Sequence, residues 1–389
     1  MTTLSGRAWR SKSRMPTDPS TPTVILVGAG HAHLHIASRA ADYRAQGARL
    51  VLIDPGRFWY SGMATGLLGG QYSAADDQVD PARLIEHHGG TFIRDEVTAV
   101  DPHKRMVTLA SGRALRYDWL SLNVGSEVHL GKLSAPDGGP RVWPVKPIPP
   151  LHTLRRELES AMAARGRMPH VVVVGGGATG SELAANLAAL ARRHAVAPCV
   201  TLVSRSSAVL PQAPAQASAK LQRVLNHCSV TLRLATSVTR LTTGGVQLDD
   251  GTELPCDHVV AAVGLQAKAL TQALGLPASR DGLRVCAQMH SVDDPRIFAA
   301  GDCADYAPRR LPKLGVFGVR AAAVIHQNLL ASLAGQPLKP YQPQRRWLAI
   351  LNLGDGRGLL LWWRLWWLGR SSAWLKNRID QRFMRQFRV

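Results

Sequence analysis

Two glycine-rich turns hold the residues of this sequence that are best suited to cofactor chemistry. Gly28 and Gly30 follow directly after the apolar run Thr23–Val27. Glycines at this spacing permit a tight strand-to-helix turn and let the backbone approach a pyrophosphate. Asp54, which ends the next apolar run, is suited to accept hydrogen bonds from ribose hydroxyls. The pattern predicts a dinucleotide site, in which His33 replaces the third glycine and is expected to push helix and strand slightly apart.

The second turn contains the complete G-x-G-x-x-G pattern. Gly175, Gly177 and Gly180 follow the all-valine run Val171–Val174 and precede an Ala- and Leu-rich helical pattern over 183–190. A buried strand before the glycines and a helix after them are the context that this pattern requires. The sequence therefore predicts a second dinucleotide site, and hence two cofactors.

The coenzyme preference is indicated by the strand that follows this second turn. Residues 200–203 form an apolar run that ends in Ser204 and Arg205. The carboxylate that usually binds the ribose of NADH is missing there, and an arginine can bind a 2′-phosphate instead. This corner favours NADPH over NADH.

Further glycines are expected to bring the backbone close to a flavin. The run 297–300 leads into Gly301 and Asp302, which provide a close backbone and one carboxylate for the ribityl-phosphate chain. Another apolar strand, 119–124, ends at Gly125. The Gly- and aromatic-rich loop after Asp54 would lie near the flavin ring.

Length, composition and charge limit the remaining possibilities. The chain has 389 residues, 46 % of them hydrophobic, which is enough for two or three domains and excludes a disordered protein. Its formal net charge is +20, and a strongly basic chain suggests an anionic partner. Residues 341–389 combine ten Lys or Arg with six of the ten tryptophans. This combination favours a membrane surface over nucleic acid.

The C-terminal apolar stretch, residues 358–370, is too short to cross a bilayer, which needs about 20 residues. Its tryptophans and arginines suit the membrane interface. Alternatively, these tryptophans pack on the flavin domain or form a contact in a homodimer.

The five cysteines are widely spaced and contain no C-x-x-C pair. No cysteine precedes Cys199, so disulfide reduction by a cysteine pair is not expected. A reducing, cytoplasmic compartment is predicted, with possible attachment to the cytoplasmic face of a membrane. Residues 1–22 are interpreted as a disordered lead-in, with an organelle transit peptide or a true start at Met15 as alternatives.

No metal site is expected at His31, His33 and His35. Alternate positions at a helix start spread side chains around the helix and do not place them on one face. His31 is interpreted as a neighbour of the flavin phosphates.

The order of the motifs resembles that of the FAD-dependent pyridine nucleotide-disulfide oxidoreductase superfamily over about residues 23–340. The matching segments are G-A-G at 28–30, L-N-V-G-S at 122–126, G-G-G-A-T-G-S-E at 175–182, A-V-G at 262–264 and F-A-A-G-D at 298–302. V-K-P at 145–147, P-K-L-G-V-F at 312–317 and the segment 374–384 resemble a narrower branch. That branch is related to type II NADH dehydrogenases and to the region fused to selenide, water dikinase in some proteins.

This resemblance implies roles for individual residues. It implies FAD contacts from Gly28, Gly30, Asp54, Gly125, Gly301 and Asp302. It implies nicotinamide-coenzyme contacts from Gly175, Gly177, Gly180 and Glu182. It also places Lys146 and Lys313 near the flavin ring, where a cation would stabilise the negative charge of the reduced flavin.

The predicted fold class is α/β, with two Rossmann-like domains. The FAD domain covers 23–145 and 281–340, the NAD(P)H domain 146–280, and a basic, Trp-rich segment 341–389. The predicted function is oxidation of NAD(P)H through FAD, with electrons passed to a quinone or another small acceptor. The alternatives are a flavoprotein redox sensor without quinone turnover and a reductase of a soluble acceptor linked to selenium metabolism.

Overall fold

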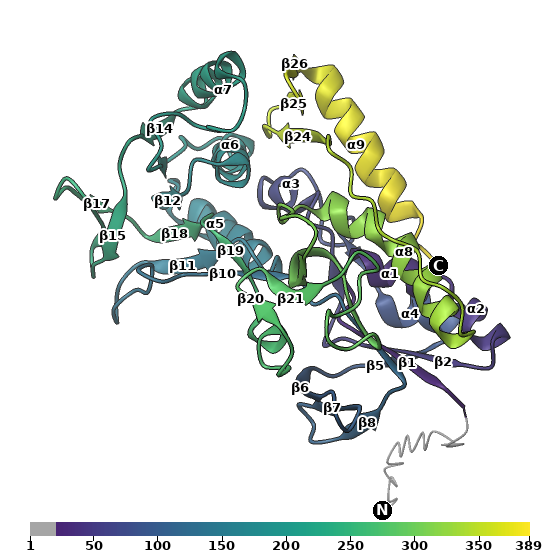
Figure 1. The fold of residues 1–389 in the computed structure, drawn as a ribbon. Coiled ribbons are helices and arrows are strands. Elements are labelled where there is room, and N and C mark those ends of the chain that lie inside the picture. The colour runs from purple at the N-terminus through teal and green to yellow at the C-terminus, as the bar shows by residue number, and fades with distance from the viewer. Residues whose placement is uncertain (1–20) are drawn as a thin grey trace, which may run out of the picture.

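The computed structural model describes residues 21–389 and confirms the predicted α/β class. Two parallel sheets of five strands each form the centres of two domains (Figure 1). Each sheet lies in its own hydrophobic core. The expectations for residues 1–20, including Met15, lie outside the described residues.

The first sheet is built from buried apolar strands, and all its neighbouring strands pair in parallel. All five residues of β1 are buried, as is typical of a strand that is covered on both faces. In pairing order, the strands are β22 (Ile297–Ala299), β9 (Trp119–Leu122), β1 (Thr23–Val27), β2 (Arg49–Ile53) and β5 (Thr91–Ile93). The accompanying helices are α1 (His31–Ala37), α2 (Ala40–Ala45), α4 (Pro81–His87) and α8 (Gly315–Leu333).

Shorter elements surround this domain. They are β3 (Phe58–Trp59) with β4 (Gln78–Val79), helix α3 (Ala64–Leu68), the three-stranded sheet β6 (Val97–Asp101), β7 (Met106–Leu109) and β8 (Ala114–Arg116), and the sheet β20 (Ala278–Ser279), β21 (Gly282–Val285) and β23 (Ala304–Tyr306). Two short 3-10 helices cover Ala269–Thr271 and Gly301–Cys303.

The second sheet repeats the same plan. Its strands, in pairing order, are β11 (Arg141–Pro144), β18 (His258–Ala261), β12 (Val171–Val174), β13 (Val200–Val203) and β14 (Val230–Arg233). Helices α5 (Pro149–Arg165), α6 (Ala178–Arg193) and α7 (Ala215–His227) accompany it, with the small sheet β15 (Val238–Leu241), β16 (Gly245–Leu248) and β17 (Glu253–Pro255). The antiparallel pair β10 (Ser126–Val128) and β19 (Leu265–Ala267) connects the two domains.

The structure differs from the predicted domain boundary at residues 145 and 146. Strand β11 precedes this boundary but pairs in parallel with β18, so it belongs to the second sheet. The run 144–150 has the Pro-rich composition that is typical of a linker, but in the structure it ends strand β11 and begins helix α5, whose first residues are prolines. Proline is well tolerated in the first turn of a helix, because the backbone N–H groups there have no partner within the helix.

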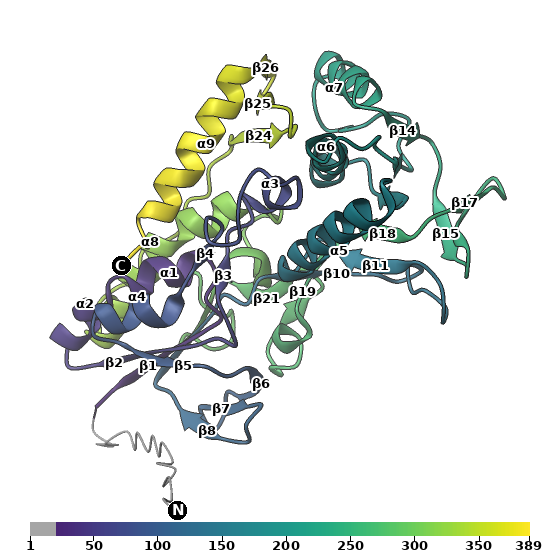
Figure 2. The same ribbon diagram turned by 180° about the vertical axis from the view of Figure 1, so that it is seen from behind.

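The C-terminal segment is folded and joins the two domains. It forms the antiparallel sheet β24 (Leu348–Asn352), β25 (Gly358–Trp362) and β26 (Leu365–Gly369), followed by helix α9 (Arg370–Arg385). Figure 2 shows α9 running beside α8 and α3, with the sheet near α6. Met384 and Phe387 lie in the first core, whereas Leu353 and Leu359 lie in the second. The segment therefore holds the two domains together.

One helix among residues 21–389, α8, has the length and apolar composition of a membrane span. Its buried residues include Ala321, Ala322 and Ile325, which belong to the first core. Helix α8 packs against α1. These contacts are those of a core helix.

Candidate functional site

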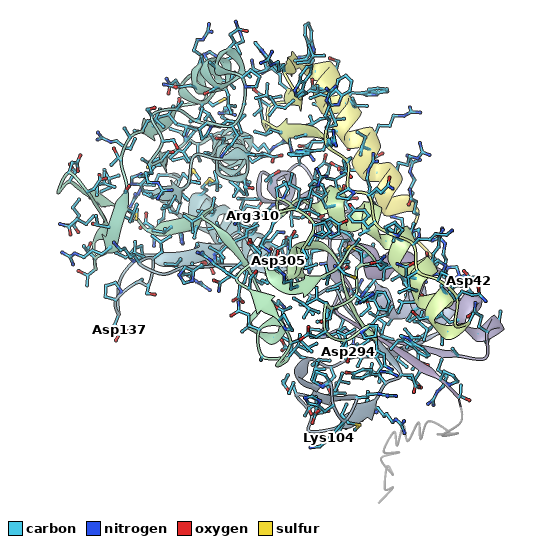
Figure 3. All side chains as sticks on the ribbon, viewed as in Figure 1. Asp42, Lys104, Asp137, Asp294, Asp305 and Arg310 are labelled. Atoms are coloured by element: carbon cyan, nitrogen blue, oxygen red, sulfur yellow. The ribbon has the colours of Figure 1, made fainter. Side chains whose placement is uncertain are left out.

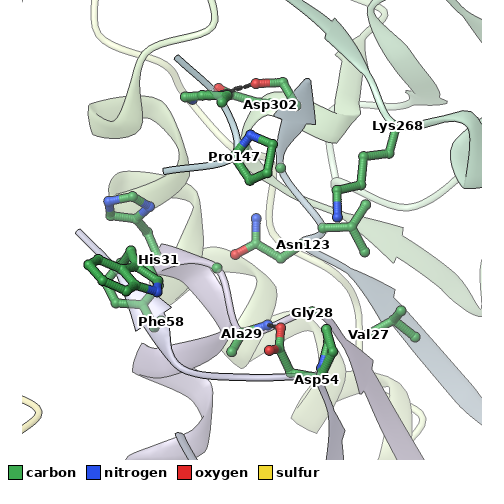
Figure 4. Close-up of a pocket in the computed structure, with 18 of the residues that line it drawn as sticks. Val27, Gly28, Ala29, His31, Asp54, Phe58, Asn123, Pro147, Lys268 and Asp302 are labelled. Carbon is green, nitrogen blue, oxygen red and sulfur yellow. Dashed lines mark hydrogen bonds and ion pairs between the residues drawn. The ribbon is translucent and has the colours of Figure 1, made fainter. Parts of the chain in front are cut away.

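A cleft of about 310 Å³ opens at the carboxyl ends of β1, β2 and β9 (Figure 4). This edge of a parallel sheet is where α/β proteins bind their ligands. The cleft is lined by these residues singled out in the sequence: Gly28, Gly30, His31, Asp54, Gly125, Lys146, Gly301 and Asp302. Asp54 lies at one end of the view and Asp302 at the other, so the cleft is elongated, as a dinucleotide requires.

The two glycines of the first turn are required by the close approach of β9. Gly28 has a φ of +84°, and a Cβ there would lie 2.8 Å from the carbonyl oxygen of Asn123. A Cβ on Gly30 would lie 2.3 Å from the side-chain Oδ1 of the same asparagine. Any larger residue at either position would push β9 away from the turn.

Asn123 is a site residue whose role sequence reasoning missed. Its Oδ1 accepts hydrogen bonds from the backbone N–H groups of Ala32 (3.0 Å) and His33 (3.4 Å). Its Nδ2 donates to the carbonyl oxygen of Ala300 at 2.7 Å. One side chain thus joins the start of α1, the end of β9 and the end of β22. In the sequence, the available signal was an asparagine directly after an apolar run.

His33 takes the position of the missing third glycine without leaving a polar atom unpaired. Its Nδ1 lies 2.6 Å from the carbonyl oxygen of Gly28, and its Nε2 lies 2.8 Å from Oγ of Ser121. Burial lowers the pKa of His33 to about 3, although the bond to Gly28 opposes this shift. The neutral ring therefore lies between the turn and β9 and is hydrogen-bonded to both.

Asp54 holds the turn from the neighbouring strand β2. Its two carboxylate oxygens accept hydrogen bonds from the N–H groups of Ala29 (2.7 Å) and Gly56 (2.8 Å). Burial raises the pKa of Asp54, while these two N–H groups oppose the shift. Each carboxylate oxygen can accept more than one hydrogen bond, so a ribose in the cleft could share it.

At the other end of the cleft, Asp302 binds Lys146 and Ser126. The Ser126 hydroxyl donates to Oδ2 of Asp302 at 2.7 Å, and the ammonium of Lys146 forms an ion pair with the same oxygen. Burial alone would raise the pKa of Asp302, but Lys146 and Ser126 hold it below its usual value. Asp302 is therefore an anion beside a cation.

Lys313 is turned toward the backbone. Its Nζ donates to the carbonyl oxygens of Asp281 (2.7 Å) and Asp302 (2.5 Å). Burial lowers the pKa of Lys313, and the charge of Asp302 opposes this. Lys146 lines the main cleft, whereas Lys313 lines a smaller cavity beyond Asp302. Of the two lysines, Lys146 is thus the one with direct access to the cleft.

His31 lies among aromatic rings at the start of α1. Its ring centroid is 5.0 Å from that of Phe58, 5.6 Å from Tyr60 and 5.5 Å from Phe383 of helix α9. Burial and, to a smaller extent, the charge of Lys146 lower the pKa of His31 to about 4. A neutral His31 connects the cleft to the C-terminal helix.

The backbone is open where a cofactor would approach. Gly125 has a φ of +76°, and no atom lies within 4 Å of a Cβ built on it. In the second turn, a Cβ on Gly177 is equally unobstructed, whereas one on Gly180 would lie 1.8 Å from the carbonyl oxygen of Gly175. Gly177 precedes α6, which has no acidic residue in its first turn. Bare N–H groups at such a helix start suit a pyrophosphate. The described residues fit two dinucleotides.

Two further predicted residues lie in the second domain. Arg205 is exposed directly after β13. Glu182, in contrast, faces α3 and β24: its Oε1 accepts from the hydroxyl of Thr65 at 2.9 Å and from the N–H of Asn352 at 2.7 Å. Burial raises the pKa of Glu182, while Lys376 opposes the shift. Glu182 therefore connects the second domain to the C-terminal segment.

The sequence profile of the pyridine nucleotide-disulphide oxidoreductases matches residues 22–322. A nitric oxide reductase FlRd-NAD(+) reductase from Pectobacterium atrosepticum is 29 % identical and covers 88 % of each chain. The demethylphylloquinone reductase NdbB from Synechocystis is 26 % identical and covers 91 % of this chain and 93 % of its own. Among solved structures, NDH2 from Plasmodium falciparum superposes with a TM-score of 0.80 at 13 % identity, with 95 % of both chains covered.

We predict that Asn123→Ala weakens the cleft more than the fold as a whole. The substitution leaves the carbonyl of Ala300 and the N–H of Ala32 without their partner, a loss of about 1–3 kcal/mol. The variant should lose bound flavin on gel filtration and show a lower melting temperature. Asn226→Ala, at an exposed position of α7, is the control and should behave like the wild type. Full flavin retention by Asn123→Ala would contradict the role assigned to Asn123.

Proposed function

Because the chain belongs to the pyridine nucleotide-disulphide oxidoreductase family, we propose that it carries electrons from NADPH through FAD to a quinone at a membrane surface. The enzyme is an oxidoreductase that uses FAD and NAD(P)H. When bound, FAD accepts a hydride from the nicotinamide and passes two electrons on to a second substrate. The donor, the acceptor and the membrane are the parts that we propose.

Within the cleft, we propose that Gly28, Gly30 and Asp54 bind the adenosine half of FAD. Gly125, Gly301 and Asp302 would follow its ribityl chain, and Lys146 would lie near the flavin ring. The positive charge of Lys146 favours additional negative charge in the cleft, and Asp302 keeps that ammonium in position. Lys313 would act indirectly, by fixing the backbone of Asp302.

The coenzyme preference rests on the end of β13. Ser204 is buried and its Oγ accepts from the N–H of Ser206 at 3.2 Å, so a small neutral residue stands where a carboxylate would repel a 2′-phosphate. Arg205 follows it, and Arg233 ends the adjacent strand in register with Val203. Both arginines are exposed. This cationic corner supports NADPH as the donor.

The observation that carries the membrane proposal is the exposed aromatic surface of the C-terminal segment. Trp363, Trp367 and Trp374 each have an exposed fraction of 62 %, and Leu365 one of 60 %. Arginine side chains lie over two of these rings: Arg346 is 4.2 Å from the Trp363 centroid, and Arg378 is 5.5 Å from that of Trp374. Exposed rings beside cations suit the anionic headgroup region of a bilayer.

The hairpin between β25 and β26 gives this surface a distinct shape. Trp363 lies in its turn with a φ of +56°, a conformation that large side chains rarely adopt. Figure 3 shows side chains projecting outward around β26 and along α9 at this end of the molecule. A strained, exposed tryptophan supports a functional role for the turn.

The position of α9 supports a quinone as the acceptor. This helix carries Trp374 on its exposed side and Phe383 against Tyr60 and His31 at the cleft. Helix α9 would therefore extend from the membrane surface, where a lipid-soluble acceptor is dissolved, to the cleft. The similarity to a relative named as a quinone reductase agrees with this acceptor. A cytoplasmic enzyme resting on the inner face of a membrane would fit these features.

Anaerobic titration followed by turnover tests the proposal. NADPH should bleach the flavin absorbance, and a water-soluble quinone should restore it with multiple turnovers. Bleaching without reoxidation by quinone would overturn the acceptor and favour a soluble redox partner. If neither NADPH nor NADH bleaches the flavin, the proposal that NADPH is the donor is overturned.

For the coenzyme, Arg205→Asp should lower kcat/KM for NADPH by about ten-fold or more, because a loss of about 1.4 kcal/mol of binding corresponds to that factor. Activity with NADH should stay unchanged. Arg223→Asp makes the same charge change at an exposed position of α7 and serves as the control. Equal effects of the two variants on NADPH would remove Arg205 from the coenzyme site.

For the membrane, the full-length protein should co-sediment with vesicles of equal parts phosphatidylcholine and phosphatidylglycerol. The double variant Trp363→Ser/Trp367→Ser should bind about ten-fold or more weakly. Val292→Ser changes an exposed apolar residue elsewhere, with an exposed fraction of 42 %, and should bind normally. Removal of the whole segment is unsuitable, because Met384 and Phe387 belong to the first core. Equal sedimentation of all three proteins would contradict the assigned surface.

A further inference from the structure

Two carboxylic acids are buried beneath helix α9. Asp77 comes directly before β4; its side chain is 0 % exposed, and neither carboxyl oxygen has a hydrogen-bond partner. Asp380 of α9 is 3 % exposed, and its oxygens accept from the hydroxyl of Tyr60 at 3.0 Å and the ammonium of Lys376 at 2.8 Å. Lys376 also donates to the carbonyl of Gly62 at 2.5 Å.

The charges in this cluster do not balance if both acids are ionised. Five charged or titratable groups interact with Asp77. They are Asp380 and Lys376 from α9, Tyr60 after β3, Tyr72, and Asp76, which precedes Asp77 in the chain. Lys376 is the one cation in that set, and it is bound to Asp380. A carboxylate with no cation of its own is very unfavourable in a buried site, which favours a neutral Asp77 there.

The electrostatic environment of Asp77 agrees with a neutral acid. Burial and then the charge of Asp380 raise the pKa of Asp77 to about 8, while Lys376 opposes the shift. Burial also raises the pKa of Asp380, but Lys376 and the Tyr60 hydroxyl counteract it. At neutral pH the pair therefore holds one proton, mainly on Asp77.

This acid pair adjoins the candidate active site. The ring of Tyr60 stacks on Phe383 with a centroid distance of 4.6 Å, and it lies 5.6 Å from the ring of His31, which lines the cleft. Ser61, the next residue, also lines the cleft. The pair therefore lies on the α9 side of the cleft, the side from which we propose that the acceptor approaches.

We propose that Asp77 stores a proton beneath α9 and, after its carboxyl group turns to meet Asp380, supplies through Asp380 and the hydroxyl of Tyr60 the proton that reduction of the acceptor consumes. The proposal rests on the proposed quinone reduction. In that reaction, NADPH and one proton convert the acceptor A to AH2 and leave NADP+. The hydride carries two electrons and one proton. The second proton leaves the carboxyl O–H of Asp77, which water then reprotonates.

Other groups near the cleft are less suited to this role. A pKa of about 4 leaves His31 without a proton to donate at neutral pH. Asp302 is paired with Lys146, which keeps it ionised. Burial and the nearby charge of Asp380 raise the pKa of Tyr60, so its hydroxyl passes on a proton only by receiving one in exchange. Asp77 is then the source in this set. Tyr60 and Asp380 are hydrogen-bonded to each other and connect to Asp77 once its carboxyl group turns toward Asp380.

The proton on Asp77 can be detected without turnover. Since its pKa is about 8 in the folded protein and about 3.9 when unfolded, the folded state binds more protons, and stability falls as pH rises through the folded pKa. The contribution of Asp77 to the melting temperature of wild type should fall between about pH 4 and pH 8 and level off above, and Asp77→Asn should remove this part of the pH dependence. Asp137→Asn, a control at an exposed position between β10 and β11, should keep the wild-type slope.

Infrared spectroscopy gives a second readout that a purely structural role would not produce. Wild type at neutral pH should show the carbonyl band of a protonated carboxylic acid, which shifts in D2O and loses intensity in Asp77→Asn. If this band keeps its full intensity in Asp77→Asn, or if that variant retains the full pH slope of wild type, the assignment of the proton to Asp77 is overturned.

Rapid-mixing kinetics test the delivery of the proton. Asp77→Asn should be reduced by NADPH at the wild-type rate but reoxidised by quinone about ten-fold or more slowly, with a flattened pH profile. Tyr60→Phe should slow reoxidation similarly. Wild-type reoxidation rates in both variants would overturn proton supply. If the wild type reduces no quinone, the proposed function and the delivery step both fail, while the infrared band still reports the proton on Asp77.

Discussion

The close contact between the turn after β1 and the end of β9 determines the shape of the cleft. Gly28 and Gly30 leave room for the backbone and side chain of Asn123, and Asn123 in turn binds the start of α1 and the end of β22. Three strand ends are thereby held at fixed separations. Because a dinucleotide is recognised largely by backbone groups, this arrangement prepares the cleft before a cofactor binds.

Charge pairing imposes a second constraint on the site. At one end of the cleft, Lys146 and Asp302 form an ion pair, and Ser126 is a further donor to Asp302. Beneath α9, Lys376 is paired with Asp380, and the neighbouring Asp77 has no cation of its own, so burial raises its pKa. The attraction within a pair offsets part of the cost of burying its two charges, whereas an acid without a cation lowers that cost by retaining a proton.

The C-terminal segment connects these features to the surface. Its strands complete the second core, its helix completes the first, and Asn352 binds Glu182 of the second domain. The same segment exposes Trp363 and Trp374. Events at a membrane surface would therefore act on an element that touches both domains. The segment therefore packs against both domains, although it is rich in exposed aromatic residues.

The sequence by itself determined both glycine turns, the buried strands that precede them and the α/β class, because these follow from local patterns of glycine and apolar residues. It did not reveal that Arg141–Pro144 forms a strand, since its partner His258–Ala261 is remote in the chain and the prolines favoured a linker. The bridging role of Asn123 and the bond between Tyr60 and Asp380, 320 positions apart, were likewise decided only by tertiary structure. A buried hydrogen bond or shared proton depends on which residues the fold brings together, and local pattern contains no record of that.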